Sequence, residues 1–150
     1  MKLAWIIVNG PLSQKHAALR RLEVIADTYL SLNTPVQLAA KVLLEQRRSV
    51  QPQLLSRIAE NLAELDRQLA SQRSCERLII SGGWCAVLRV PLIHSDEDLA
   101  IALLEKCSVF VHPGHFYDFP RDGYLVLSLI TPPAAFRVGV SRLLEFAQNL

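Results

Sequence analysis

The apolar positions of the first half of the chain change from a continuous run to helical spacing. Residues 2–8 are nearly all apolar, which predicts a strand that is covered on both faces. Apolar residues then recur every three or four positions, which predicts three helices. The first follows Ser13 and ends near Leu30, the second begins at Thr34, and the third follows Pro52. Ser13 and Thr34 are expected to cap their helices, and the polar segment 46–51 with Pro52 predicts a bend or a break.

The second half alternates short apolar runs with two more helices. Strands are expected over residues 77–80, 84–90, 109–111 and 124–130. Ser95 and the acidic residues after it predict a helix through Lys106, because side-chain oxygens and negative charge stabilise a helix N-terminus. Thr131-Pro132-Pro133 opens a last helix, whose apolar stripe is formed by Phe136, Val140, Leu143, Leu144 and Ala147.

This order of elements predicts an α/β fold whose second half is a small α+β domain. One strand and three helices precede a β–β–α–β–β–α unit. The helix between the runs at 84–90 and 109–111 suits a right-handed crossover in a small mixed sheet flanked by helices.

Composition excludes several classes of protein. The net charge is +2, from 16 basic and 14 acidic residues, which does not favour nucleic acid or an anionic membrane surface as a partner. No apolar run reaches the ~20 residues that span a bilayer, and residues 2–8 lack the cleavage site of a signal peptide. The three cysteines have no CxxC spacing, which favours reduced thiols and a cytoplasmic location.

The motifs that usually carry chemistry are missing from the sequence. His94, His112 and His115 match no zinc-binding pattern, and Gly82-Gly83 has neither the further glycines nor the lysine of a phosphate loop. There is no GxSxG nucleophile elbow. The carboxylates fall mostly in helix caps and on polar faces, which does not indicate a paired acid–base site. These features alone indicate a soluble α/β domain.

Four stretches, taken in order, resemble the C-terminal part of class I/II aminotransferases, which are pyridoxal-phosphate enzymes of fold type I. They are KLAW at 2–5, LNTPVQ at 32–37, GWCAVLRVP at 83–91, and VHPGHFY at 111–117, which is similar to the family's V-x-PG-x-x-F corner. The resemblance implies that residues 1–12 are a remnant strand of the large cofactor-binding domain, 13–75 are interdomain helices, and 76–150 are the small C-terminal domain.

The resemblance also implies a function. The parent protein would exchange an amino group between an amino acid and a 2-oxo acid, with pyridoxal 5'-phosphate as cofactor. This portion would close over the substrate, as a homodimer or in association with the missing large domain. The family's Schiff-base lysine would lie before Met1, so no catalytic residue is assigned and the chain alone is expected to be inactive.

The resemblance also implies roles for individual residues that stand at the family's functional positions. Lys2 matches a basic residue that contacts the cofactor phosphate; the alternative is a solvated terminal lysine. Val126 stands where many relatives have the arginine that binds the substrate carboxylate, and valine cannot form those hydrogen bonds. Arg89 and Arg121 are the candidate replacements, although Arg89 could form a structural ion pair and Arg121 could be a solvated turn residue. The substrate entrance would be lined by His112, His115, Phe116 and Tyr117, for which packing of the turn is the alternative role.

A second hypothesis is a stand-alone, non-catalytic binding module derived from the same fold. It would use the strand expected at residues 3–8 as a docking edge. A small enzyme of another kind is a third option, but no nucleophile or metal-binding set in the sequence favours it.

Overall fold

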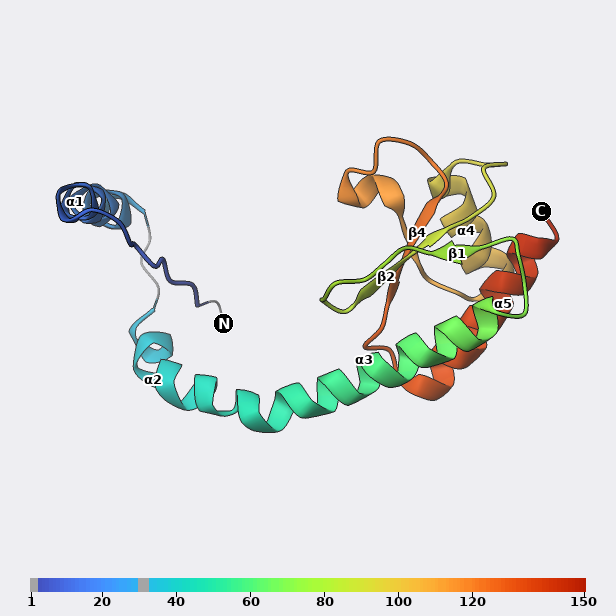
Figure 1. Cartoon of the computed structure of the whole chain (residues 1–150), viewed down its shortest axis with the longest axis horizontal. Helices are drawn as coiled ribbons and strands as arrows, with labels where there is room; N and C mark the ends of the chain where they lie inside the picture. Colours follow the sequence, from blue (N-terminus) through green and yellow to red (C-terminus); the bar gives the residue numbers. More distant parts are fainter. Residues whose placement is uncertain (1–2, 30–32) are drawn as a thin grey trace. The chain divides into compact units, whose positions relative to one another are not determined.

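The computed structural model describes residues 3–29 and 33–150 (Figure 1). Contacts divide the chain into two units, Met1–Val50 and Gln51–Leu150. The expected cofactor contact at Lys2, and the helix end and chain break expected near Leu30 and Leu32, lie outside the described residues. The domain boundaries that the resemblance implies, after residues 12 and 75, stay predictions.

The first unit contains an extended segment and two helices, α1 (Leu12–Thr28) and α2 (Thr34–Glu45). The strand expected at 2–8 is wrong for residues 3–8, because strand structure needs a paired neighbour and the described residues supply none there. Ser13 does not cap α1, which has Pro11 at its N-cap position. Asn33, not Thr34, caps α2 and accepts a 3.1 Å hydrogen bond from the backbone N–H of Val36.

Helix α3 (Arg47–Leu69) begins directly after Gln46, the C-cap of α2. The expected break therefore falls at Gln46, and α3 continues through Pro52. A proline inside a helix removes one backbone hydrogen bond, and here that loss does not end the helix.

The second unit contains a four-stranded sheet in the order β1-β2-β4-β3. Its strands are β1 (Glu76–Arg77), β2 (Cys85–Arg89), β3 (His112–Pro113) and β4 (Tyr124–Ser128). The expected mixed sheet is wrong, since every pairing in this sheet is antiparallel. Because β2 and β3 both run antiparallel to β4, they point the same way, and α4 (Asp96–Cys107) crosses between them. The strands expected at 77–80 and 109–111 are shorter or shifted, to Glu76–Arg77 and His112–Pro113.

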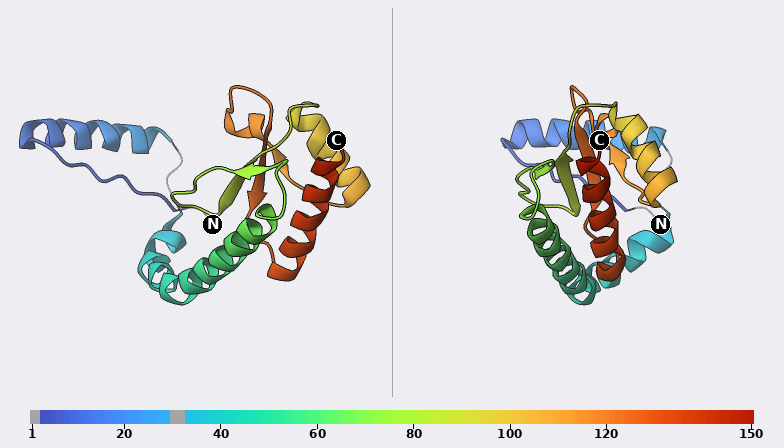
Figure 2. Two further views of the ribbon diagram at one scale, coloured as in Figure 1. Left: turned by 45° about the vertical axis from the view of Figure 1, so that its right-hand side comes forward. Right: turned by 90° about the vertical axis from the view of Figure 1, so that its right-hand side faces the viewer.

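The hydrophobic core lies on one face of this sheet, against α3, α4 and α5 (Pro133–Gln148), which Figures 1 and 2 show together on the same side. Ser95 caps α4, as expected, by accepting a 3.1 Å hydrogen bond from the Asp98 N–H. The α5 stripe is also confirmed: all five expected residues are buried. The core face of the sheet is formed by Ala86, Leu88, Leu125, Leu127 and Leu129.

Two polar side chains fix α3 to the rest of the unit. The Asn61 Nδ2 donates 2.8 Å hydrogen bonds to the carbonyls of Leu129 and Thr131, and Gln68 Nε2 donates to the carbonyl of Arg137. The spacing of the sequence predicts that Leu55, Ile58, Leu62, Leu65 and Leu69 form the inward face of this helix. Leu65 is fully buried, whereas Leu55 is exposed and does not belong to the buried face. Sequence spacing therefore finds the buried face of α3 only in its C-terminal half.

Candidate functional site

The face of the sheet opposite the core is the candidate functional site. Directly paired residues of antiparallel strands share a face, and alternate residues of one strand do too. The register pairs Arg89 with Tyr124, and Val126 with both Val87 and His112. We call this surface the open face, defined by Glu76, Cys85, Val87, Arg89, His112, Tyr124, Val126 and Ser128. The helices α3, α4 and α5 pack on the other side, and the short 3-10 helix η1 (Gly114–Tyr117) contacts β3 and β4 (Figure 1).

The buried carboxylate of Asp96 fixes the loops at the end of this face. Asp96 is the first residue of α4 and is 1% exposed. Its Oδ1 accepts hydrogen bonds from the N–H groups of Gly123 and Tyr124, the latter at 3.0 Å, and its Oδ2 accepts one from Gly114 at 3.2 Å. One side chain therefore joins the Pro-Gly corner, the second turn and the start of β4. A carboxylate with several N–H donors can remain buried because its charge is solvated by those dipoles.

A Cβ at position 114 would collide with this arrangement. It would lie 2.8 Å from Asp96 Oδ2, 2.8 Å from the Cβ of Tyr124, and 3.1 Å from the Tyr124 carbonyl oxygen. Glycine is therefore required at the corner because a larger side chain would clash. Its backbone conformation does not itself require glycine, since its φ angle is not in the left-handed region.

Two arginines meet at the hydroxyl of Tyr124. Arg121 Nη2 donates to the Tyr124 hydroxyl at 3.4 Å, and Arg89 is the cross-strand neighbour of Tyr124. The hydrogen bond from Arg121 lowers the pKa of Tyr124, and Arg89 lowers it further. Phe119 stacks on the Tyr124 ring with centroids 4.6 Å apart, which holds the phenol in place. Arg89 also forms a 3.1 Å ion pair with Glu76.

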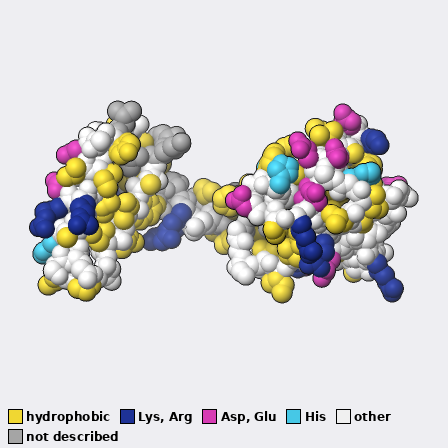
Figure 3. All heavy atoms as spheres, turned by 90° about the horizontal axis from the view of Figure 1, so that it is seen from above, with side chains coloured by type: hydrophobic (Ala, Val, Ile, Leu, Met, Phe, Trp, Pro, Cys, Tyr) yellow, Lys and Arg dark blue, Asp and Glu magenta, His cyan; other side chains and the backbone are white. Residues whose placement is uncertain are grey.

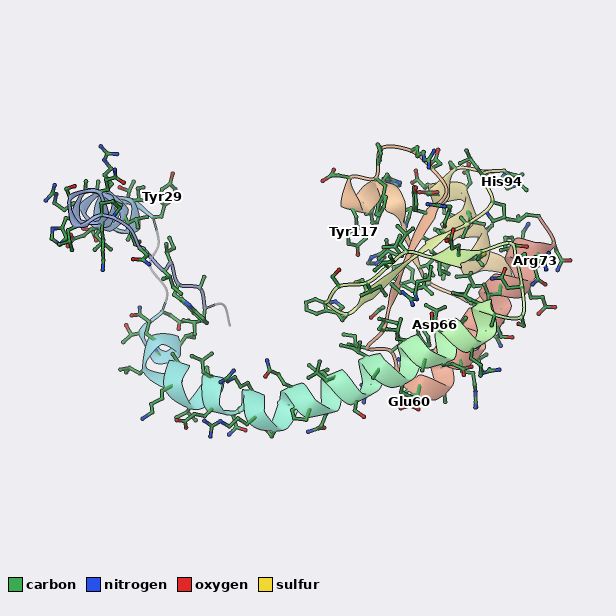
Figure 4. The ribbon with its side chains drawn as sticks, in the orientation of Figure 1. Tyr29, Glu60, Asp66, Arg73, His94 and Tyr117 are labelled. Atoms are coloured by element: carbon green, nitrogen blue, oxygen red, sulfur yellow. The ribbon has the colours of Figure 1, made fainter. Side chains whose placement is uncertain are left out.

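An aromatic group surrounds His112 on the β3 side of the open face, where His112 is paired with Val126. The Nδ1 of His112 and the hydroxyl of Tyr117 are 2.8 Å apart, and their rings are stacked. Phe110 meets His112 edge-on at 5.2 Å, and Phe116 is tilted against it at 5.9 Å. Tyr117 projects from η1 (Figure 4), and Phe116, on the same helix, is 65% exposed. These side chains present apolar ring surface beside one imidazole.

The structure thus groups the residues singled out in the sequence. Arg89 and Arg121 both contact or adjoin Tyr124, while His112 and Phe116 contact each other. Val126 lies between the two groups on the same face and is 5% exposed, so it forms an apolar floor. The sequence does not identify Asp96 or Tyr124 as site residues. An acidic residue in the first turn of a helix is expected to be solvated, and Tyr124 is brought to Arg89 only by the register of β2 with β4.

The residues of this unit do not form a complete site for pyridoxal phosphate. Such a site needs a lysine amine and a cradle for a phosphate group. Lys106 is the only lysine in residues 51–150 and lies over the ring of Phe146, in the last turn of α4. Cys75 is not a replacement nucleophile, since burial raises the pKa of its thiol to about 11.

The described residues 3–29 and 33–150 contain no group of three or more histidine, cysteine or acidic side chains placed to hold a metal ion. None of the helices in those residues combines the length and the apolar character needed to cross a bilayer.

Comparison with solved structures finds this fold in pyridoxal-phosphate-dependent aminotransferases. A PLP-dependent aminotransferase from Streptococcus suis aligns with 91% of this chain at 21% identity and a TM-score of 0.73. Alanine aminotransferase from Pyrococcus furiosus aligns with 93% at 18% identity and a TM-score of 0.73. The alpha-aminoadipate aminotransferase of Thermus thermophilus, complexed with N-(5'-phosphopyridoxyl)-L-leucine, aligns with 90% at 19% identity and a TM-score of 0.67.

The aligned parts are 35%, 35% and 36% of those three chains, so this chain spans about a third of their length. No protein-family model matches the chain, and no curated protein matches it. The chain therefore has the fold of one part of a PLP-dependent aminotransferase, consistent with a C-terminal portion. The α+β class expected from the sequence is confirmed, with an antiparallel sheet in place of a mixed one.

Proposed function

We propose that this chain is the interdomain-helix and small-domain portion of a pyridoxal-phosphate-dependent aminotransferase. The whole protein would transfer an amino group between an amino acid and a 2-oxo acid. The observation that supports this most is the agreement of fold over about nine-tenths of the chain with several aminotransferases. A small domain that presents an open sheet face, with arginines around Tyr124 and rings along the β3 edge, suits a substrate-facing role.

In this proposal the open face closes over the substrate and excludes water, which is a positioning role. The Asp96 contacts keep the two turns at the end of that face in fixed positions during closure. The cofactor, when bound, would supply the electron sink for amino transfer, and the lysine that holds it would belong to the large domain. Lys2 as a contact to the cofactor phosphate, and a homodimeric assembly, are parts of the same proposal.

The test is to read the DNA upstream of the Met1 codon and to express any longer reading frame found there. A Ser-x-x-Lys a few residues before Lys2, in frame or frameshifted, is expected, and the longer product should transfer amino groups. The 150-residue chain, mixed with pyridoxal phosphate and dialysed, should keep no cofactor absorption band. A retained band that disappears in Lys2→Ala would contradict the assignment, as would a long upstream region without such a motif.

A stand-alone binding module is the second candidate function, because the segment 3–8 exposes large apolar side chains. Trp5, Ile6 and Ile7 are 64%, 73% and 83% exposed, and Figure 3 shows hydrophobic side chains at the surface. Exposed extended backbone with such residues can pair with another chain. Chromatographic mass and amide hydrogen exchange at residues 3–8 test this: protection in a monomer would count against a docking segment.

A further inference from the structure

The cluster of Arg89, Arg121 and Tyr124 presents more hydrogen-bond donors than its own surroundings use. Two guanidinium groups and one hydroxyl converge at the start of β4, and Arg121 donates to that hydroxyl at 3.4 Å, a long hydrogen bond. A guanidinium carries five N–H donors in a planar fork that fits a carboxylate.

The acidic side chains near the cluster do not neutralise both arginines, so the cluster can bind another anion. Glu76 holds Arg89 through a 3.1 Å contact, but the two side chains are 69% and 51% exposed, and such surface pairs contribute little. Asp122, next to Arg121, accepts a 3.2 Å hydrogen bond from the Asp96 N–H. None of the ion pairs found among the described residues includes Arg121.

The distance between the cluster and the aromatic group determines how far apart the charged and the apolar parts of a ligand must be. Tyr124 and Val126 are two residues apart on one face of β4, which corresponds to about 7 Å along a strand. His112 is paired with Val126 and carries the rings of Phe116 and Tyr117 beside it. The open face therefore has cationic donors around Tyr124, an apolar floor at Val126, and aromatic rings along its β3 edge.

We propose that Arg89, Arg121 and Tyr124 bind the carboxylate of a small acid with an aromatic body, and that its ring lies over Val126 against the His112 group. This inference rests on the proposed aminotransferase function and names aromatic amino and 2-oxo acids as its substrate class. The contact to the substrate carboxylate would be made by Arg89, Arg121 and Tyr124 in place of a residue at position 126. The lowered pKa of Tyr124 agrees with this site, because it reports the positive potential there.

The experiment titrates the ¹⁵N-labelled 150-residue chain with 3-phenylpropanoate, a stable acid that requires no cofactor to bind. We expect amide shift changes in all three parts of the open face, in residues 85–89 of β2, 112–117 of β3 and η1, and 121–128 around β4. Propanoate, which lacks the ring, and 3-phenylpropanol, which lacks the charge, should each bind at least tenfold more weakly. Arg121→Gln and Arg89→Gln should each weaken binding of 3-phenylpropanoate about tenfold.

Arg142→Gln is the matched control, since it removes the same charge from an exposed site on α5, where Arg142 donates to the Cys107 carbonyl. It should leave the affinity unchanged, and Arg121→Lys should restore only part of it, because lysine keeps the charge without the fork. The proposal is overturned if no shift changes occur, if the alcohol binds as well as the acid, or if Arg142→Gln and Arg121→Gln have equal effects.

Failure here would be distinguishable from failure of the proposed function. A longer reading frame that transfers amino groups, together with an isolated chain that ignores 3-phenylpropanoate, would overturn only the carboxylate site. Binding by the isolated chain, with no upstream lysine motif, would overturn only the aminotransferase role.

Discussion

Replacing Asp96 with asparagine should destabilise the second unit far more than its position in a helix cap suggests. The change removes the charge and keeps one acceptor oxygen, while three backbone N–H groups, of Gly114, Gly123 and Tyr124, still point at the side chain. The asparagine amide would then face at least one of these donors with its own N–H₂ group. An unsatisfied buried donor costs ~1–3 kcal/mol, and a hydrogen bond loses part of its strength when its acceptor becomes neutral.

Relief of the carboxylate desolvation offsets part of this loss. We therefore expect Asp96→Asn to lower the free energy of unfolding by about 1–3 kcal/mol, since the weakening of the two remaining hydrogen bonds and the relief of desolvation act in opposite directions. The slope of the free energy with denaturant should not change, since the same surface is exposed on unfolding.

The measurement is urea unfolding at pH 7 by circular dichroism, combined with amide hydrogen exchange at Leu125 and Leu127. Both residues pair with β2, so their exchange reports on the unit Gln51–Leu150 even if the first unit unfolds separately. Glu97→Gln is the control, because Glu97 is exposed and lies in the same first turn of α4. Its loss should be only the helix-dipole term of ~0.3–1 kcal/mol.

The reasoning is refuted if the two variants lose the same stability to within about 0.5 kcal/mol, the usual spread of surface substitutions. A stabilised Asp96→Asn variant would also refute it, since the desolvation of the carboxylate would then outweigh its three hydrogen bonds.

Three further predictions follow from single contacts. Gly114→Ala should cost ~1–3 kcal/mol of unfolding free energy by overpacking, whereas Gly82→Ala, with no atom within 4 Å of the added carbon, should cost less than about 0.5 kcal/mol; urea midpoints compare them. Cys75 should resist alkylation in the native chain, because its pKa is raised to about 11, while the other two thiols react; equal labelling by mass spectrometry would contradict this. The Arg67 hydrogen bond lowers the pKa of Glu64 to about 2, so the stabilisation by this pair should be fully present above pH 4.5 and be lost as the pH falls through 2. Carboxyl NMR should show the Glu64 midpoint near 2, rising towards 4.5 in Arg67→Gln, and an unchanged midpoint would show that another contact sets it.

Local signals in the sequence predicted the elements whose structure depends on local contacts. The Ser95 cap and the apolar stripe of α5 are both present as expected, since capping and helical periodicity involve residues within a few positions of each other.

Features that depend on distant partners were not predictable in the same way. Val109 and Val111 are buried, as their apolar run suggests, but the ladder with β4 begins only at His112, because pairing follows the register of the partner strand. Asp96 lies in a sequence context typical of a solvated helix start. Its burial arises from Gly114 and Gly123, which are 18 and 27 residues away.

The candidate site shows the same division. Arg89 and Arg121 were singled out from the sequence as separate candidates, and their convergence on Tyr124 follows from the pairing of β2 with β4. The prediction of a strand at residues 3–8 is wrong for a related reason. An apolar run indicates that a segment can form a strand, but the strand also needs a partner to pair with.

The way Asp96 holds its loops has a consequence for how this surface can diversify. The two ends of the loop 114–123 are held together by main-chain N–H groups that donate to one buried carboxylate, that of Asp96. In other loops a bound metal ion, which has the opposite charge, holds the chain in this way. Main-chain amides are common to almost every residue type, so the loop between them can change its side chains while the anchoring carboxylate stays. His115, Phe116 and Arg121 are exposed positions within that loop. New specificities can therefore be selected in the loop without a new solution to its folding.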